Sequence, residues 1–526
     1  MLQKKLIQIL TRNFYKKNFY IFLLILSSFY FTFYYGYIGI FPIDSFLIYD
    51  AGFKLLNGGH PFKDYWSITG PILDYFQFFF FKVFGINWFS YVLHAATINC
   101  LITILLFYFL RQLNVGLTFS FIYSISASIL AYPSVGTPFM DHHAVIFSLS
   151  SLMYLFLAFR KNETFSWFIV PIFLSASFLS KQIPSAYLLI LFIIFIFLYG
   201  YLFPQKNYKF ILSLIYGSIL SILIFLLFLF SNKIPFSNFL TQYILYPLEI
   251  GKVRGSQYNF TLSSIVLQFK FIYFSLIPLI FILYKFLGKK INNEVKKDLF
   301  LLTFTIFGVV FFIFGQLMTK NQILIFFLIP FCLGVSHHFF KKYYDKKFMT
   351  YIFMSILIFS TIKYHLRFNE NKKFMELNNV NLNLAAKAEN LDNSLTGLKW
   401  ITPKFAKNPN LEIKNLNKIK NIILSDKTSK IIITDYQILP SILKLKNIAP
   451  NKWFDDLSVP DKKNQFFLNY KKFFINKLSS QKIITLYVFD EKKIFIERIF
   501  DNNCYDEKKI LPNLSKLNIK NCLNYK

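Results

Sequence analysis

Acidic side chains are scarce in this sequence, which has 26 Asp and Glu residues against 58 Lys and Arg residues and a formal net charge of +32. In a soluble protein, such an excess of basic residues would indicate nucleic-acid binding. Here, however, 55% of the residues are apolar and Phe alone contributes 70, which is more apolar surface than a soluble fold buries. We therefore interpret the lysines as residues of membrane-flanking loops and expect no nucleic-acid partner.

Sequence motifs of nucleotide and zinc enzymes are also missing. The chain has no Walker A sequence, no Rossmann glycine fingerprint and no His-Glu-x-x-His motif, which argues against nucleotide-driven transport and zinc proteolysis. A cleavable signal peptide is not expected either, because the first apolar run is too long and lacks a small-residue cleavage site. We expect this run to act as an uncleaved membrane anchor.

Cysteine is rare, with four residues in the chain. Cys100 and Cys332 lie in predicted membrane spans, where we interpret them as packing residues. Cys504 and Cys522 lie in the C-terminal region with 17 residues between them. A disulfide between them would stabilise a periplasmic domain by ~3 kcal/mol in the loop-entropy model, and two unpaired thiols are the alternative.

Long apolar runs recur along residues 1–366, and we predict a polytopic α-helical membrane domain with about 11 spans there. Each run is near the ~20 residues that cross ~30 Å of hydrocarbon as a helix. The predicted spans are 18–40, 88–110, 117–134, 143–159, 165–180, 184–203, 209–231, 263–286, 299–317, 322–339 and 348–363. The positive-inside rule places the N-terminus in the cytoplasm. The outward connections are then 41–87, 135–142, 181–183, 232–262 and 318–321.

Residues 367–526 are polar in character. Strand-like runs at 430–434, 483–488 and 493–497 and a helix-like run at 466–478 predict a small soluble α/β domain. Cations flank both ends of the eleventh apolar run, so the charge rule leaves open the side on which this domain lies. It is periplasmic if that run crosses the membrane, as we expect, and cytoplasmic if it does not.

The first outer loop, residues 41–87, carries carboxylates in a half of the chain where they are otherwise scarce. It begins FPIDSFLIYDAGFKLLNGGHPFKDYW. Apolar residues recur at helical spacing between positions 46 and 56, and Asn57-Gly58-Gly59 is a helix C-cap signal. We therefore expect a short helix between Asp44 and Asp64, and an interfacial helix rather than a span within residues 67–88.

Titratable side chains gather on the predicted outer face. They are Asp44, Asp50, His60, Asp64, Asp141, His142, His143, Lys181, Lys252, Arg254 and Lys320. Carboxylates and spaced cations at one water–lipid boundary suit a lipid phosphate, because the cations would neutralise the phosphate while a carboxylate takes a proton from an acceptor hydroxyl. Simpler roles also fit them individually: a helix cap for Asp141, snorkelling for Lys181 and a solvated loop for Lys252 and Arg254.

The run PIDSFLIYDAGFKLLNGGHPFKDYWSITGPILDYF resembles the first outer loop of the glycosyltransferase C (GT-C) superfamily. It is closest to the protein-mannosyltransferase-like (family 39) and rhizobial lipopolysaccharide-transferase-like branches. The shared features are an acidic residue just after span one, a helix ending in glycines, a Gly-x-Pro-aromatic-x-Asp turn and a proline-containing interfacial helix.

This resemblance implies an inverting hexosyltransferase. Such an enzyme would move a sugar from a polyprenyl-phosphate donor to a hydroxyl of a cell-envelope glycan, lipid (such as lipopolysaccharide) or protein, at the periplasmic face of the bacterial inner membrane. The resemblance implies that Asp44 is the catalytic base. Asp141 resembles a second acidic motif, and Lys181 and Arg254 resemble cations that contact the donor phosphate. Many members have Asp-Glu where this chain has Asp44-Ser45. A divalent metal, held by Asp44 and Asp141, therefore stays an open question.

Two other functions fit the same pattern. A transporter or flippase of a lipid-linked or anionic solute would place its polar groups at mid-membrane, often in inverted repeats, whereas the ionisable residues here cluster at one edge. A glycan polymerase or ligase would instead use Arg and His in a late outer loop. The acidic first loop favours the transferase.

Overall fold

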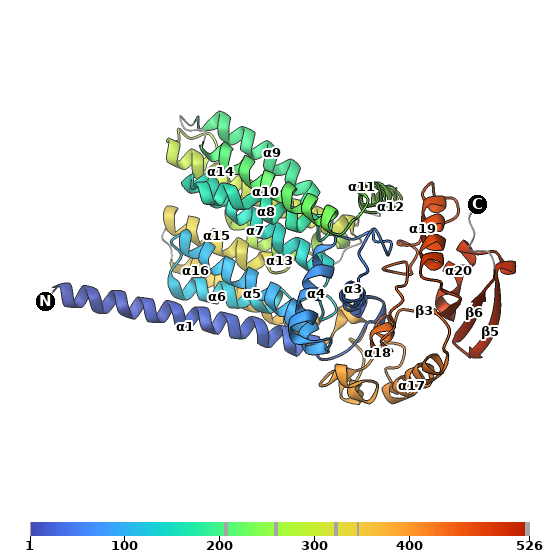
Figure 1. Ribbon diagram of the computed structural model, residues 1–526. Helices are drawn as coiled ribbons and strands as arrows, with labels where there is room; N and C mark the ends of the chain where they lie inside the picture. The colour runs from blue at the N-terminus through green and yellow to red at the C-terminus, as the bar shows by residue number, and fades with distance from the viewer. Residues whose placement is uncertain (1, 205–208, 257–260, 320–323, 345–346, 521–526) are drawn as a thin grey trace.

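The computed structural model describes residues 2–204, 209–256, 261–319, 324–344 and 347–520. It consists of a helical bundle and a C-terminal region that contains a small sheet (Figure 1). The helices of the bundle run roughly side by side, with α1 (Leu2–Gly36) along one edge, and the C-terminal region lies beyond one end of them. Because a lipid-embedded backbone must satisfy its own hydrogen bonds, helices are the expected form for these apolar runs.

Seven helices in the described part of the chain are long and apolar enough to cross a membrane. They are α1, α5 (Trp88–Gln112), α7 (Met140–Lys161), α9 (Ser185–Leu202), α10 (Lys209–Ser231), α14 (Asn293–Met318) and α16 (Lys347–Tyr364). The protein is thus a helical membrane protein.

The prediction of eleven spans is not supported by helix length. The other four predicted runs form α6 (Leu117–Leu130), α8 (Thr164–Phe178), α13 (Lys270–Phe286) and α15 (Leu328–Tyr343), with 14, 15, 17 and 16 residues. At 1.5 Å per residue, helices of this length reach roughly 21–26 Å, which is less than the ~30 Å hydrocarbon core. Residues that the sequence pattern assigned to these spans lie outside the helices, in turns such as 131–134 and 324–327 or in the π-helical segment Ser263–Leu267 before α13.

Helix α7 is the centre of the bundle, since nearly all of it is buried. Serines let α8 approach it closely: the Ser148 and Ser177 hydroxyls are 2.7 Å apart, and Ser177 also donates to the Ala144 carbonyl. Helix α10 packs on α8 just as tightly, because a Cβ on Gly217 would lie 2.1 Å from the Phe168 carbonyl oxygen. Small residues at such crossings are typical of membrane helix packing.

The first loop contains α2 (Pro42–Ser45), α3 (Leu47–Leu56) and α4 (Ile72–Phe84). The predicted short helix is therefore confirmed as α3, and the chain turns at Gly58 with φ +80°, as the C-cap signal indicates. Helix α4 is the predicted second helix of the loop. A later connection holds α11 (Phe236–Phe239) and α12 (Tyr246–Ser256), so the residues around Lys252 and Arg254 form a helix rather than the predicted loop.

The C-terminal region has a four-stranded mixed sheet in the order β3-β4-β6-β5. Its strands are β3 (Lys430–Ile433), β4 (Thr485–Phe489), β5 (Tyr505–Leu511) and β6 (Leu514–Ile519). Strands β3 and β4 are parallel, and the other two pairings are antiparallel. A small two-stranded ladder joins β1 (Ala386–Lys387) to β2 (Lys399–Trp400).

The helices of this region are α17 (Pro409–Ser425), α18 (Leu439–Ile442), α19 (Phe467–Ser480) and α20 (Lys493–Ile499). Two of the three predicted strands and the predicted helix are confirmed as β3, β4 and α19. The predicted strand at 493–497 is wrong, because these residues form α20. Its alternating isoleucines suggested a strand, but Phe495, Ile496 and Ile499 are buried together at helical spacing.

The C-terminal region packs directly against the first loop. Two backbone hydrogen bonds join Trp66 to the segment 450–452: the Trp66 N–H donates to the Pro450 carbonyl, and the Lys452 N–H donates to the Trp66 carbonyl. Near the end of α1, the Ile40 N–H donates to Ile401, and the Phe46 and Trp400 rings stack with their centroids 5.7 Å apart. The first loop and the C-terminal region therefore lie on the same side of the bundle (Figure 1).

Candidate functional site

Asp44 is held by the short helix α2 at the end of the bundle that contacts the C-terminal region. The Ser45 hydroxyl accepts a hydrogen bond from the Phe41 N–H at 3.0 Å, and the Ser45 carbonyl accepts one from the Tyr91 hydroxyl at 2.9 Å. From the C-terminal region, the Trp453 indole donates to the Ile43 carbonyl at 2.7 Å. These bonds fix the backbone on both sides of Asp44, while its half-buried carboxylate makes no hydrogen bond or ion pair with the described residues.

Asp141 and Lys181 form an ion pair beside this position. Asp141 lies in the first turn of α7, and Lys181 lies in the turn between α8 and α9. The Lys181 Nζ is 2.6 Å and 2.7 Å from the two Asp141 carboxylate oxygens. Asp141 is buried and Lys181 is partly accessible, so the carboxylate holds the ammonium group at the edge of the bundle.

Asp44 interacts electrostatically with both of these residues. Its pKa is raised to about 7, chiefly by burial and additionally by the carboxylates of Asp455, Asp141 and Asp435, while the Lys181 ammonium lowers it. A carboxylate with a pKa near neutrality and no protein partner is the form expected of a general base. These interactions place carboxylates of the bundle and of the C-terminal region near Asp44 of the first loop.

Arg254 of α12 is a second cation that acts on Asp141. It interacts electrostatically with Asp141 and Asp455, and burial lowers its pKa. Its Nε is buried and has no hydrogen-bond partner among the residues that the structure describes. Arginine presents five N–H donors in a planar fork that matches phosphate geometry, so this side chain has unused capacity for an anion.

Asp455 and Asp435 were not predicted from the sequence. The Asp455 carboxylate accepts hydrogen bonds from the N–H groups of Leu457 and Ser458, at 3.2 Å and 2.7 Å, and Asp435 pairs with Lys492 at 2.7 Å. They belong to a polar region far along the chain, where no local pattern separates them from its other acidic residues. Only the docking of the C-terminal region brings them near Asp44.

Other predicted site residues join the first loop to the C-terminal region. The Asp64 carboxylate lies 3.2 Å from the Lys477 Nζ and accepts the His60 N–H at 2.9 Å. The His60 ring contacts the Tyr75 hydroxyl at 2.8 Å. Asp50 pairs with Lys54 at 2.7 Å, and Lys54 donates to the Asn451 carbonyl. Each of these side chains thus stabilises the loop or its junction with the C-terminal region.

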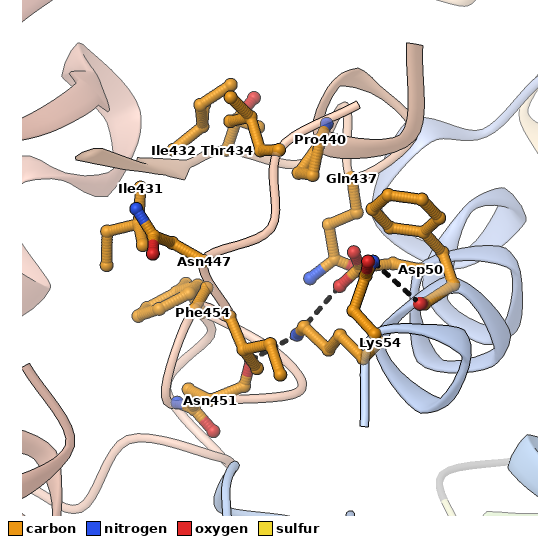
Figure 2. Close-up of a pocket in the computed structure, with 15 residues that line it drawn as sticks. Asp50, Lys54, Ile431, Ile432, Thr434, Gln437, Pro440, Asn447, Asn451 and Phe454 are labelled. Atoms are coloured by element: carbon orange, nitrogen blue, oxygen red, sulfur yellow. Dashed lines mark hydrogen bonds and ion pairs between the residues drawn. The ribbon is translucent and has the colours of Figure 1, made fainter. Parts of the chain in front are cut away.

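Figure 2 shows the cavity at this junction. Asp50 and Lys54 of α3 face Gln437 and Asn451 of the C-terminal region across it. Its volume is about 20 Å³, enough for about one water molecule and too small for a sugar or a phosphate. We therefore assign this cavity to the packing of the junction.

The remaining predicted residues face elsewhere. His142 contacts the Ala131 carbonyl and His143 contacts the His94 ring, both buried in the bundle. Lys252 is exposed and pairs with Glu249 on its own helix. Of the eleven residues predicted for the outer face, Lys320 lies outside the described residues. Asp44 interacts electrostatically with Asp141 and Lys181, and Arg254 interacts with the same Asp141.

The metal site left open by the sequence finds no support in the geometry. Within the described ranges, no group of three or more His, Cys, Asp or Glu side chains is arranged to hold a metal ion. Both oxygens of Asp141 accept hydrogen bonds from Lys181, so a cation already occupies the position where a metal would bind that carboxylate. Asp44 and Asp141 therefore do not fit a shared metal site.

Of the cysteines, Cys100 and Cys332 are free. Cys504 is disulfide-bonded, and Cys522 lies outside the described residues.

No protein-family model matches this chain, and no curated protein matches it significantly.

Proposed function

We propose that this protein is a GT-C-type membrane glycosyltransferase that transfers a sugar from a polyprenyl-phosphate donor to an acceptor hydroxyl, with inversion. The observation that carries the proposal is the carboxylate of Asp44, which has no hydrogen-bond or ion-pair partner among the described residues and a pKa raised to about 7. Lys181 acts electrostatically on Asp44, and Arg254 acts on the same neighbouring carboxylates, Asp141 and Asp455, at one end of the membrane bundle. The donor is already activated, so the chemistry needs a base and a stabilised leaving group.

In this mechanism, the ionised Asp44 accepts the proton of the acceptor hydroxyl as the oxygen attacks the anomeric carbon. The bond from that carbon to the phosphate oxygen breaks, and the phosphate leaves with the electron pair. Arg254 and Lys181 stabilise the leaving phosphate. Asp141 acts as a positioning residue, since it holds two of the three Lys181 donors and leaves one for the phosphate.

The proposed topology places the site in the periplasm of a bacterial inner membrane, with α6, α8, α13 and α15 crossing together with the seven longer helices. Short helices of this kind are accommodated by local thinning of the bilayer or by snorkelling of flanking residues. The disulfide-bonded state of Cys504 supports a periplasmic C-terminal region, because disulfides persist in oxidising compartments. Because that region contacts the first loop, Asp44 lies on the same side of the membrane.

The test uses purified protein in lipid nanodiscs, with undecaprenyl-phosphate-linked hexoses as donors and envelope lipid extract as acceptor. Asp44→Asn keeps the shape of the side chain and removes the base, so we expect sugar transfer to fall by 10²–10⁴-fold with undecaprenyl phosphate binding retained. Asp64→Asn is the matched control, because Asp64 belongs to the same loop but is engaged by Lys477. We expect it to keep activity within about twofold.

A second arm tests the phosphate contact. We expect Arg254→Gln to weaken binding of undecaprenyl phosphate by roughly tenfold or more, since hydrogen bonds to charged groups contribute about 1.5–3 kcal/mol. Full transfer activity of Asp44→Asn would remove the base from the proposal. Binding of undecaprenyl phosphate without transfer in the wild type, across all donors, would favour a carrier of lipid-linked solutes instead.

A further inference from the structure

A groove between α13 and α16 opens on the lipid-facing surface of the bundle. It has a volume of about 520 Å³, within the range of small-molecule sites. Its walls are formed by Phe271, Phe274, Ile277 and Pro278 of α13 and by Met349, Ile352, Phe353, Ser355, Ile356 and Phe359 of α16. Only Ser355 among them is polar, so the groove suits a hydrocarbon chain.

Three cations gather at the outer end of this groove. Lys270 begins α13, Lys363 lies in the last turn of α16, and Arg367 lies in the π-helical segment His365–Glu370 that continues it. The Lys363 Nζ is 5.0 Å from the centre of the Phe271 ring and 6.0 Å from that of Phe359, both of which line the groove. Lys363 also interacts electrostatically with Lys270 and Arg367, so the three charges repel one another.

Neither the two lysines nor the arginine has a carboxylate partner among the described residues. The Arg367 Nε is buried and makes no hydrogen bond there. The positive-inside rule concentrates cations at the cytoplasmic ends of spans, whereas this cluster lies at the end that also carries the first loop and the C-terminal region. Mutual repulsion at this position is relieved by an anion.

The dimensions of the groove indicate what kind of anion this is. From Met349 to Phe359, the groove follows α16 for roughly 15 Å, which is about half of the ~30 Å hydrocarbon core. A single acyl chain of the outer leaflet has this reach. The charged groups that act on Lys363 are the cations Lys270 and Arg367, whereas Arg254 and Lys181 act on carboxylates. The cluster therefore suits a bound anion.

We propose that the α13–α16 groove binds an anionic phospholipid of the outer leaflet, with one acyl chain along the apolar walls and the phosphate between Lys270, Lys363 and Arg367. This lipid is a structural partner and not the donor of the proposed reaction. By filling the groove and neutralising the three cations, the lipid stabilises the packing of α13 against α16 at the end where the chain enters the C-terminal region.

The experiment compares phosphatidylglycerol with phosphatidylethanolamine binding to the delipidated full-length protein by native mass spectrometry. The test variant is Lys270→Gln/Lys363→Gln/Arg367→Gln. We expect its affinity for phosphatidylglycerol to fall by roughly fivefold for each cation removed, with phosphatidylethanolamine binding unchanged. The matched control removes three cations at the opposite end of α13, as Lys285→Gln/Lys289→Gln/Lys290→Gln, and we expect it to retain the preference for phosphatidylglycerol.

Photoactivatable phosphatidylglycerol provides a readout on the wild-type protein that does not depend on the folding of any variant. We expect crosslinks to peptides of α13 and α16. Crosslinks confined to other helices, or equal phosphatidylglycerol affinity in the test and control variants, would overturn the proposal. A parallel loss of undecaprenyl phosphate binding in the test variant would also overturn it, because the groove would then belong to the donor. None of these measurements requires transferase activity.

Discussion

The buried ion pair between Asp74 and Lys452 connects the first loop to the C-terminal region, and its removal is the most direct test of this architecture. The Lys452 Nζ lies 2.6 Å from one Asp74 oxygen, and the Tyr65 hydroxyl donates to the other at 2.8 Å. The side chains are 3% and 0% exposed. Replacing Lys452 by Met keeps the length of the side chain but leaves Asp74 buried with one hydrogen bond.

Breaking a buried pair by removing one partner costs about 3–5 kcal/mol, because the other charge stays uncompensated. In a domain of 150–250 residues, this corresponds to a fall of roughly 6–20 °C in the unfolding midpoint. Replacing both charges is expected to cost much less. In Asp74→Asn/Lys452→Met the Asn oxygen can still accept from Tyr65, and no buried charge remains.

The measurement is the thermal unfolding midpoint of the purified protein in detergent, together with the rate at which protease releases the C-terminal region. The control is Lys477→Met, which breaks the pair with Asp64 at 3.2 Å, where both side chains are 22–24% exposed. An exposed pair contributes about 0–1 kcal/mol, so this variant should unfold within a few degrees of the wild type. Equal midpoints for Lys452→Met and the wild type would refute the buried connection.

The remaining predictions concern the site. Because the pKa of Asp44 is raised to about 7, its carboxylate form dominates only above that pH. The rate of sugar transfer should therefore rise with pH around pH 7, and at one pH unit below it should be about a tenth of the plateau rate. A rate that is already constant from pH 5 upward would contradict the role of Asp44 as the base. Between about pH 4 and 7, Asp44 is ionised in the unfolded state but still protonated in the folded state, so the wild type loses stability as the pH rises through this range. Asp44→Asn lacks this group and should become more stable relative to the wild type over the same range. The measurement is the unfolding midpoint of both proteins at pH 5 and pH 8. Gly70→Ala should destabilise the protein by about 1–3 kcal/mol or more, since its Cβ would lie 1.8 Å from the Leu179 carbonyl oxygen, whereas Gly251→Ala, with open space around its Cβ, should leave the midpoint unchanged or raise it.

Local patterns predicted much of this protein because they reflect local physics. Apolar runs become helices wherever hydrocarbon leaves the backbone no other partner, and the Asn57-Gly58 signal ends α3 because the chain turns there with a positive φ. The β-branched and aromatic runs of β3 and β4 are fully buried strands. Residues 493–497 have a local pattern that fits either a strand or a helix, and they form a helix because it buries Phe495, Ile496 and Ile499 together. Helix length also departed from the pattern, since apolar residues continue into turns.

The sequence by itself determined that the chain is a helical membrane protein with a polar C-terminal α/β region, and it indicated Asp44, Asp141, Lys181 and Arg254 on one face. Only the tertiary structure decided which carboxylates keep a free charge and which are neutralised by a partner. Asp50 and Asp64 are paired within the loop and across the junction, while Asp455 reaches the space around Asp44 from more than 400 positions away in the chain. Ion pairs and electrostatic fields depend on distances in space, and the spacing of residues along a chain does not contain those distances.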